Sequence, residues 1–397
     1  MGEFDAFYFF HKVGFIGKPG IRAPLSSAAS GGKGGRARKG SNMIPQTMRA
    51  CLLTSANAFA IREVPVPRAE AGEVLCRIRA VAICGTDPEI VHGTHLTKGW
   101  PPCYPFILGH EWSGEVVEAG PGVTEFKVGD RVAGEAHKGC GICGNCTRGN
   151  YTLCLNYGKI DRGHRHYGFT VPGANCEYNV YSVKAVHKIP DNLSFPHASL
   201  VDTAGVALHG IKLIGITPGG TVAVYGPGPI GLCAMQIARG LGAGRVVMVG
   251  RGRRLEAAGE MGADFTVDFD KEDPVRRILE ITDGVGADEA LECSGGTETP
   301  RQCVDSVRKG GKISILGFYE DQKVSFPVLT KIALHEITLV GSRANPNVSA
   351  ETVRLFSRGI LNGERIVTHR FPLEKYEEAF YTFTKRKGGA IKVVVEP

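Results

Sequence analysis

The stretch Thr-Val-Ala-Val-Tyr-Gly-Pro-Gly-Pro-Ile-Gly, residues 221–231, decides the fold of the carboxyl-terminal half of the chain. Its first five residues form an apolar, β-rich run that predicts a buried strand. Glycines then follow in the Gly-x-Gly-x-x-Gly spacing, before a stretch of helical character. In that context the first glycine makes a tight turn, the second lets the backbone approach a pyrophosphate, and the third permits close helix–strand packing. We therefore predict a dinucleotide-binding loop made of Gly226, Gly228, Pro229, Ile230 and Gly231.

Strands and helices continue to alternate beyond this loop, which a bare glycine–proline turn would not require. Helices are expected over 232–240, 275–282 and 301–307, and strands over 246–249, 265–267, 290–293 and 313–316. Alternation at this length predicts a doubly wound parallel sheet, the Rossmann arrangement. We assign residues 199–341 to this domain.

The amino-terminal part of the chain has a different rhythm. Short strand-like runs such as 74–82, 114–119 and 130–133 are separated by Gly, Pro and Asp turns. This pattern predicts a partly open, barrel-like β domain over 48–198. Beyond residue 341 the chain is expected to return to that domain over 342–397. The predicted fold class is therefore α/β, with a barrel-like β domain and a doubly wound parallel-sheet Rossmann domain.

Residues 1–47 differ from the rest in composition. The segment 26–40 is rich in Gly, Ser, Arg and Lys and has no apolar period, so we expect it to be disordered. A transit peptide is one interpretation. We favour an artificial extension or an over-extended start, with Met43 or Met48 as the functional beginning.

The net charge of +7 is concentrated in the same extension, because residues 1–42 hold seven Lys or Arg and two acids. The remaining 40 basic and 38 acidic residues make a near-neutral body, which does not suggest a nucleic-acid or membrane partner. No apolar run reaches the roughly 18 residues that a spanning helix needs.

Four of the twelve cysteines form the strongest local signal. The spacing Cys140-x₂-Cys143-x₂-Cys146-x₇-Cys154 places four thiolates on one short lobe, where they can close a tetrahedral Zn²⁺ site. A closed site does not bind substrate, so its expected role is structural. The alternative, a cluster of free thiols, would be a liability to oxidation. Twelve cysteines are too few for a secreted disulfide scaffold, so a reducing compartment, the cytoplasm, is expected.

A second set of metal-binding residue types lies nearer the amino terminus. Cys84 opens the stretch Cys-Gly-Thr-Asp, and His110 and Glu111 follow 26 and 27 residues later. Sulfur, imidazole and carboxylate are ligands that suit Zn²⁺. On its own the set is weak evidence, because free cysteines are usually buried as small apolar residues.

The end of the second strand of the dinucleotide unit indicates the choice of cofactor. NAD-binding units usually carry Asp or Glu there, which accepts hydrogen bonds from the ribose hydroxyls. Here, 24 residues after Gly226, the chain has the run Gly250-Arg-Gly-Arg-Arg254. The missing carboxylate and the added guanidinium groups predict a site for a 2′-phosphate, and therefore NADP more than NAD. Gly250 would leave space for this phosphate, and Arg251 would be its main contact. A solvated basic turn is the alternative.

Taken together, the order Cys-Gly-Thr-Asp, Gly-His-Glu, four-cysteine lobe and Gly-x-Gly-x-x-Gly resembles the zinc-dependent medium-chain alcohol and polyol dehydrogenase family. The resemblance covers roughly residues 48–397, and the branch looks like that of the sorbitol, threonine and glucose dehydrogenases. It implies a catalytic domain with a catalytic and a structural zinc, and a Rossmann domain that binds the nicotinamide cofactor. It also implies a small alcohol or ketone substrate and a homodimer or homotetramer.

The resemblance assigns the ligands of the catalytic zinc. Cys84 and His110 match two of them, and the stretch 200–209 places Asp202 at the position of a third. Glu111 matches a fourth, exchangeable ligand of some members. A zinc with three protein ligands keeps an open position, where as a Lewis acid it lowers the pKa of a bound alcohol.

The resemblance also assigns residues that handle the proton and the cofactor. Thr86 matches the hydroxyl that passes the substrate proton, and Asp87 matches a carboxylate that orients the zinc histidine. Lys392 matches a basic residue that reaches the cofactor phosphates. Where many relatives have a proton-relay histidine, five residues after the zinc cysteine, this chain has Glu89, as glucose-dehydrogenase-like members do. Either Glu89 binds a polyhydroxylated substrate or the proton leaves through water.

The predicted function is a zinc-dependent oxidoreductase that transfers hydride between a secondary alcohol of a polyol, sugar or amino-alcohol and NAD(P). The runner-up is an NADPH-dependent biosynthetic reductase of ketones or aldehydes with the same fold. A zinc-ribbon nucleic-acid-binding protein explains neither the βα alternation nor the near-neutral body. The loops 92–104 and 164–176 are expected to shape the pocket, and no rule reads a substrate from them. His92 and His95 in the first loop are expected to be ordinary loop histidines.

Overall fold

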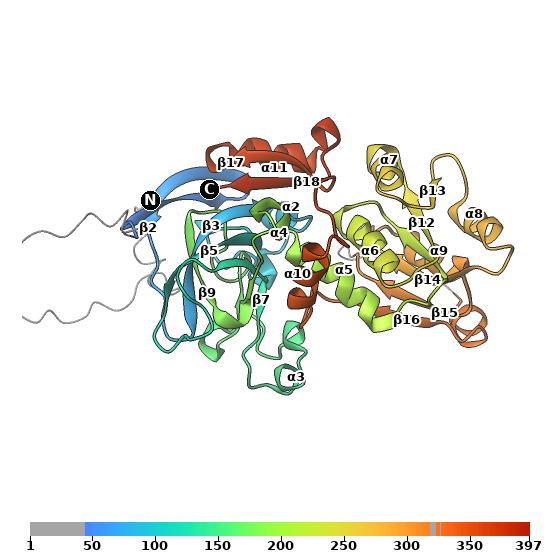
Figure 1. Cartoon of the computed structure of the whole chain (residues 1–397), viewed down its shortest axis with the longest axis horizontal. Helices are drawn as coiled ribbons and strands as arrows, with labels where there is room; N and C mark the ends of the chain where they lie inside the picture. The colour runs from blue at the N-terminus through green and yellow to red at the C-terminus, as the bar shows by residue number, and fades with distance from the viewer. Residues whose placement is uncertain (1–43, 318–322, 326) are drawn as a thin grey trace, which may run out of the picture.

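The computed structural model describes residues 44–317, 323–325 and 327–397, and its strands form two sheet systems (Figure 1). The predicted extension over 1–47 lies, up to residue 43, outside the described residues. In Figure 1 the mostly antiparallel sheets occupy one side of the molecule and the six-stranded parallel sheet the other. Helices α5 (Val201–Ile214) and α10 (Ser349–Ser357) lie between them.

The parallel sheet has the strand order β13-β12-β11-β14-β15-β16 in the part of the chain that the structure describes. In chain order this is 3-2-1-4-5-6, so the order reverses between β11 and β14, the place where such sheets bind ligands. The predicted doubly wound sheet is confirmed. Its strands are β11 (Thr221–Tyr225), β12 (Arg245–Gly250), β13 (Phe265–Asp268), β14 (Ala287–Glu292), β15 (Val307–Ile315) and β16 (Thr338–Gly341). The helices between them are α6 (Pro229–Gly240), α7 (Gly252–Glu260), α8 (Pro274–Ile281) and α9 (Thr299–Ser306).

The first helix of this unit begins earlier than predicted. It starts at Pro229, whereas the expectation placed its start at residue 232. Gly228 is the N-cap, and Pro229 occupies the first turn, where a missing N–H costs little and a φ fixed at about −65° suits the helix. The glycine loop therefore runs directly into a helix N-terminus, as phosphate binding requires.

In the part of the chain that the structure describes, the other strands form two main sheets, which are antiparallel except for the parallel pairing of β17 with β18. One has the order β2-β1-β4, and the other has the order β10-β6-β5-β3-β18-β17, with β9 also paired to β3. The last strand pairs with β3 through Val394 and Ala82. The strands are β1 (Thr47–Ser55), β2 (Ala58–Pro65), β3 (Glu73–Ala82), β4 (Phe106–Ile107), β5 (Glu111–Ala119), β6 (Arg131–Gly134), β9 (Tyr178–Ser182), β10 (Val186–Lys188), β17 (Val367–Pro372) and β18 (Lys392–Glu396). The predicted domain boundaries at 198/199 and 341/342 remain a prediction.

In this half the structure also describes a small antiparallel ribbon and short helices. The ribbon pairs β7 (His137–Lys138) with β8 (Arg165–His166). The helices are α2 (Asp87–Val91), α3 (Gly144–Thr147), α4 (Phe195–Ala198) and α11 (Tyr376–Thr384).

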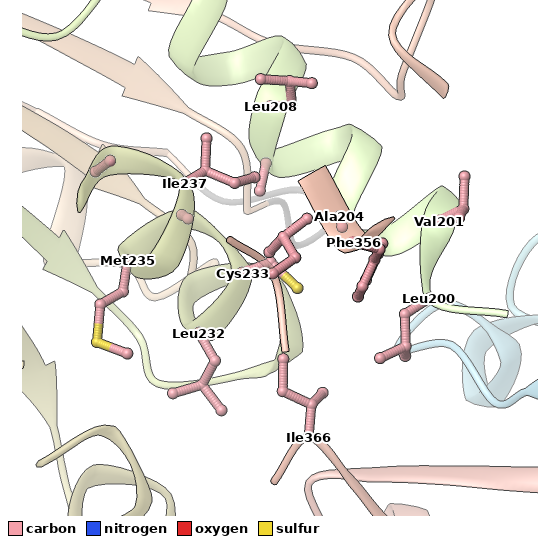
Figure 2. Close-up of a cluster of buried hydrophobic side chains, with 14 of the residues drawn as sticks. Leu200, Val201, Ala204, Leu208, Leu232, Cys233, Met235, Ile237, Phe356 and Ile366 are labelled. Atoms are coloured by element: carbon pink, nitrogen blue, oxygen red, sulfur yellow. The ribbon is translucent and has the colours of Figure 1, made fainter. Parts of the chain in front are cut away.

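A shared core joins the two sheet systems (Figure 2). It brings together Leu208 of α5, Leu232 of α6 and Phe356 of α10, and it also contains Ala82 and Ala133 from the antiparallel sheet. Full burial of one leucine contributes about 1.5–3 kcal/mol. The core therefore fixes α5, whose first turn faces the candidate site.

Candidate active site

Three of the predicted metal ligands meet at one point. Sγ of Cys84, a ring nitrogen of His110 and a carboxylate oxygen of Glu111 all lie within 4.8 Å of one another. Strand pairing brings them together, because Ala82 at the end of β3 pairs with Glu111 at the start of β5. Cys84 then lies just beyond one strand and His110 just before the other. Sulfur, nitrogen and oxygen at this spacing suit Zn²⁺.

Asp87 contacts two of these ligands. Its Oδ2 accepts a hydrogen bond from the backbone N–H of Cys84 at 2.9 Å, and its Oδ1 lies 3.6 Å from Nδ1 of His110. The side chains of Asp87 and His110 are both almost fully buried. Because Nδ1 faces the carboxylate, Nε2 is the nitrogen of His110 that remains for a metal. This geometry supports the predicted orienting role of Asp87.

The charges around His110 favour a bound cation. Burial alone would lower the pKa of His110, but its interactions with Cys84, Asp87 and Glu111 raise it to about 10. Burial raises the pKa of Asp87 above its ordinary value, since the carboxylate loses its hydration. Three acidic groups around one imidazole make a field that a divalent cation neutralises, so these residues fit a zinc ion.

Lys392 contacts one member of this set. Its Nζ lies 2.5 Å from Oε2 of Glu111 and donates to the carbonyl oxygen of Ile83 at 3.0 Å. Its side chain is only 2% exposed. The ammonium is thus engaged by Glu111, and its contact with cofactor phosphates stays a prediction.

Asp202 lies near the three converging ligands but outside their group. Its Oδ1 accepts hydrogen bonds from the backbone N–H of Ala136 at 3.2 Å and from Nδ2 of Asn345 at 3.0 Å. Burial raises the pKa of Asp202 to about 6, with His110 acting against this shift and Glu111 adding to it. One oxygen is therefore bonded to the protein, and its role as third zinc ligand stays a prediction. Glu111 is the carboxylate found with Cys84 and His110.

The predicted proton-handling residues lie around α2. Thr86 is its N-cap, and the hydroxyl oxygen lies 3.8 Å from Sγ of Cys84. Oε2 of Glu89 lies 2.5 Å from Nε2 of His95, whose side chain is 1% exposed. His95 also meets the edge of Trp100, with ring centroids 5.4 Å apart. The expectation of an ordinary loop histidine is therefore wrong for His95, because burial against a carboxylate gives it a fixed partner.

The four-cysteine lobe converges on a second point. Its sulfur atoms lie within 4.8 Å of one another, and the Cys140–Cys146 and Cys143–Cys154 pairs are each 3.9 Å apart. At the usual Zn–S distance of about 2.3 Å, the corners of a tetrahedron are about 3.8 Å apart, so the spacing fits a closed zinc site. The side chain of Asn156 donates to Cys140 and lowers its pKa to about 6, which favours the thiolate.

The three fingerprint glycines are subject to different steric constraints. Gly226 has a φ of +101°, and a Cβ there would meet Ser294 at 2.8 Å. A Cβ on Gly231 would lie 2.0 Å from the carbonyl oxygen of Gly226. Around Gly228, by contrast, an added Cβ would meet nothing within 4 Å. This open side, at the N-terminus of α6, is where a pyrophosphate is expected.

Gly250 has a packing role that the sequence did not reveal. A Cβ there would lie 2.3 Å from Cδ of Pro227 and would displace the fingerprint loop. The idea that Gly250 simply leaves space for a phosphate is therefore incomplete, since the ring of Pro227 fills the adjoining volume.

The arginines after Gly250 have different environments. The guanidinium of Arg251 lies 5.2 Å from the ring centroid of Phe269 and 3.4 Å from Oδ1 of Asp270, and its side chain is 59% exposed. An exposed pair of this length contributes little. Arg253 pairs with a glutamate on its own helix, and Arg254 donates to the carbonyl oxygens of residues 390 and 391. Of the three guanidinium groups, that of Arg251 lies farthest from its nearest hydrogen-bonding partner, at 3.4 Å.

Two loops bring rings to the site that sequence reasoning did not assign. The ring centroid of Phe169 lies 4.7 Å from that of His110, and His166 stacks on Phe169 at 3.7 Å. Trp100 meets both His166 and Phe169 edge-on. The sequence signal was the density of histidines and aromatic residues in the loops 92–104 and 164–176, which were expected to shape the pocket.

Comparison with known proteins places the chain beside dehydrogenases. Residues 70–191 match the family model of the alcohol dehydrogenase GroES-like domain, and residues 229–358 match that of the zinc-binding dehydrogenases. Sorbitol dehydrogenase from Bacillus subtilis (strain 168) is 34% identical over 359 residues, which are 89% of this chain and 98% of that protein. L-threonine 3-dehydrogenase from Pyrococcus furiosus is 36% identical over 335 residues, 83% of this chain and 93% of that protein. The crystal structure of a zinc-binding dehydrogenase from Sinorhizobium meliloti 1021 bound to NADP superposes with a TM-score of 0.81 at 31% identity, covering 89% of this chain and 100% of that one.

Proposed function

The chain belongs to the zinc-binding medium-chain dehydrogenase family, whose members are zinc-dependent alcohol and polyol dehydrogenases, and from this premise we propose that it oxidises a polyhydroxylated secondary alcohol with NADP⁺. The observation that carries the proposal is the convergence of Cys84, His110 and Glu111 beside the hydroxyl of Thr86. Similarity to a sorbitol and a threonine dehydrogenase supports a polyol, sugar or amino-alcohol as substrate.

Cys84, His110 and Glu111 would hold the catalytic zinc, with Asp202 as a further candidate. Zinc bound there supplies Lewis acidity, which lowers the pKa of an alcohol. The hydroxyl oxygen of Thr86 lies 3.8 Å from Sγ of Cys84, which supports a relay in which it accepts the alcohol proton and passes its own proton on. Asp87 keeps the ring of His110 oriented through Nδ1.

Glu89 and His95 are candidates to receive the proton from Thr86 or to bind the substrate. Glu89 lies on the first turn of α2, after Thr86, and is 24% exposed, whereas His95 is buried behind it. A carboxylate that is held by a histidine and partly open to solvent can accept hydrogen bonds from substrate hydroxyls. The same pair can pass a proton towards water.

The cofactor is a nicotinamide dinucleotide, and we propose NADP over NAD. The open side of Gly228 supports a pyrophosphate at the start of α6, and the weakly committed guanidinium of Arg251 supports a 2′-phosphate contact. The similar structure from S. meliloti was obtained with NADP.

An NADPH-dependent reductase of ketones or aldehydes is the alternative within the family, because the same residues serve both directions. If Arg251 binds the 2′-phosphate of NADPH, that preference also supports the reductase. The zinc-ribbon interpretation loses its basis, since the four-cysteine lobe lies inside the match to an alcohol dehydrogenase domain. No helix in the described part of the chain has the length and apolarity to span a membrane. A homodimer or homotetramer and a cytoplasmic location remain predictions.

The test is a set of initial rates on the zinc-loaded protein with both cofactors. We expect kcat/KM to be highest for polyols, aldoses or threonine and higher with NADP⁺ than with NAD⁺. A maximum on simple primary alcohols would contradict the substrate class. A maximum in the reductive direction with NADPH at cellular pH would establish the alternative.

A further inference from the structure

A stack of rings leads away from His110 along the ribbon of β7 and β8. His137 and His166 are directly paired across this ribbon, and their ring centroids are 3.9 Å apart at an interplanar angle of 16°. Phe169 stacks on the same imidazole of His166 at 3.7 Å and 8°, and it also contacts the ring of His110. We call His137, His166 and Phe169 the ring stack. It connects the candidate zinc ligand to residues that the proposed chemistry does not use.

Polar atoms without partners are concentrated around the ring stack. Nδ1 of His137 and Nε2 of His164 are buried and have no hydrogen-bond partner among the described residues. Buried polar groups in native proteins nearly always have partners. Two such atoms beside one stack therefore indicate a polar ligand there.

The histidines of this region are suited to hydroxyl groups. Burial, aided by the nearby positive charges, lowers the pKa of His164 to about 4 and holds the pKa values of His137 and His166 well below 6.5. The rings are thus neutral near pH 7, and a neutral imidazole offers one donor and one acceptor, as a hydroxyl does. A metal is not the expected ligand, because within the described residues the groups of converging ligand atoms lie elsewhere.

Arg343 places a positive charge at the end of the ring stack. Its guanidinium lies 5.4 Å from the ring centroid of Tyr157, and the hydroxyl of Tyr157 is hydrogen-bonded to Nδ1 of His166. The charge of Arg343 acts on His137, His164 and Tyr157. None of the carboxylates that the structure describes forms an ion pair with Arg343. The charge is therefore free to meet an anion.

The backbone around Arg343 is held in place. The N–H of Ser342 donates to the carbonyl oxygen of Ile315 at 2.9 Å, and Nδ2 of the buried Asn345 donates to Asp202 at 3.0 Å. Ala344 has a φ of +55°, a conformation that L-residues adopt only when their surroundings impose it. The backbone at Arg343 is thus held close to Asp202, while its exposed side chain extends over the ring of Tyr157.

We propose that the ring stack, Tyr157 and Arg343 form a distal subsite that binds an anionic group, a phosphate or a carboxylate, on the substrate end remote from the reacting carbon. The neutral imidazoles contact intervening hydroxyls, and Arg343 contacts the anion. The inference rests on the proposed dehydrogenase function and narrows its substrate class to polyhydroxylated alcohols with an anionic end.

Kinetics with matched substrates test the subsite. Sorbitol, sorbitol 6-phosphate and gluconate are compared in wild type, Arg343→Gln, Arg343→Lys and the control Arg276→Gln, which changes an exposed arginine on α8. In wild type we expect kcat/KM for the phosphate or the carboxylate to exceed that for sorbitol. Arg343→Gln should reduce this ratio about 10- to 100-fold, the effect of one charged hydrogen bond, and Arg343→Lys should restore part of it. The more strongly preferred anion identifies phosphate or carboxylate as the natural group.

A binding measurement separates this inference from the function on which it rests. The rise in Tm caused by sorbitol 6-phosphate or gluconate needs no turnover, and it should exceed that caused by sorbitol and vanish in Arg343→Gln. His166→Phe keeps the stack but removes the hydrogen-bonding nitrogens, so it should raise KM while kcat is largely retained. Turnover with equal ratios in wild type and Arg343→Gln would overturn the subsite alone. Absence of turnover with selective binding would support the subsite and contradict the dehydrogenase function.

Discussion

Nζ of Lys392 lies 2.5 Å from Oε2 of Glu111, and both side chains are almost fully buried. Removal of one member of such a pair leaves an uncompensated charge in a poorly hydrated place, at a cost of about 3–5 kcal/mol. Glu111 also lies with Cys84 and His110, so a zinc bound by these residues would share one carboxylate with Lys392. The pair ties β18, the last strand of the chain, to the candidate metal centre.

Replacing Lys392 should therefore destabilise the zinc-free protein more than the zinc-loaded one. In Lys392→Met we expect the free energy of unfolding without zinc to fall by about 3–5 kcal/mol, and to fall less with zinc, because the metal supplies a counter-charge. Urea unfolding with and without zinc measures both values, with Lys392→Arg as the charge-preserving control. Equal losses in the two states would mean that zinc does not neutralise Glu111.

The elements that the sequence predicted well are those with local signals. The glycine fingerprint lies between an apolar, β-rich run and a helical stretch, and this local context predicts a strand–turn–helix unit. The structure has β11 and α6 there. The four cysteines of the lobe are also close in sequence, so a loop brings them together without distant contacts. Helix α6 began early because Pro229 favours the first turn, a preference that apolar periodicity does not report.

Relationships between distant residues could not be read from the sequence in the same way. The convergence of Glu111 with Cys84 and His110 depends on the register of β3 against β5. The hydrogen bond between Asp202 and Asn345 also joins residues far apart in the chain. The contact of Gly250 with Pro227 likewise depends on the pairing of β12 with β11. The residue types predicted a zinc site and a nucleotide site, whereas the contacts of each side chain could be determined only from the tertiary structure.

Gly228 and Gly231 should respond oppositely to the same substitution. Gly228→Ala adds a Cβ in open space with an ordinary φ of −78°, so stability should change by no more than about 1 kcal/mol. The methyl group would lie where the pyrophosphate is expected, so the Kd for NADPH should rise at least about tenfold. Gly231→Ala is the matched control, since its Cβ would clash with a backbone oxygen and should lower Tm sharply. Unchanged NADPH affinity in Gly228→Ala would place the phosphates elsewhere.

Arg251 should set the preference for NADP(H). In Arg251→Ala we expect the ratio of kcat/KM for NADP⁺ over NAD⁺ to fall about 10- to 100-fold, because a charged hydrogen bond to the 2′-phosphate is lost. Arg253→Ala is the control, since Arg253 pairs with acids on its own helix. Gly250→Asp is not a clean test, because its side chain would first displace Pro227. If the wild-type protein prefers NAD⁺, Arg251 is a solvent-exposed residue that does not bind the cofactor.

The two ligand sets should give two zinc ions per chain with different exchange behaviour. Mild chelation should remove activity before it unfolds the protein, because an open site with fewer protein ligands releases zinc first. Cys84→Ser should lose activity and about one zinc while keeping most of its stability, whereas Cys143→Ser should lower Tm. Metal analysis by mass spectrometry and thermal unfolding provide the two readouts. A single zinc in fully active protein would contradict the assignment of both sites.

His164 should make the protein less stable in acid. Burial lowers its pKa to about 4, whereas an unfolded chain has a histidine pKa of about 6.5. Between these values the unfolded chain takes up a proton that the folded chain does not, so the stabilisation is complete above about pH 6.5 and is lost as the pH falls. At pH 5 the loss should approach about 2 kcal/mol, at 1.36 kcal/mol per unit. His164→Asn keeps a side-chain acceptor for the backbone N–H of Gly158 but does not titrate. Urea unfolding at pH 7.5 and pH 5 should therefore show a smaller difference in the variant than in wild type, and an equal difference would show that His164 is not the group responsible.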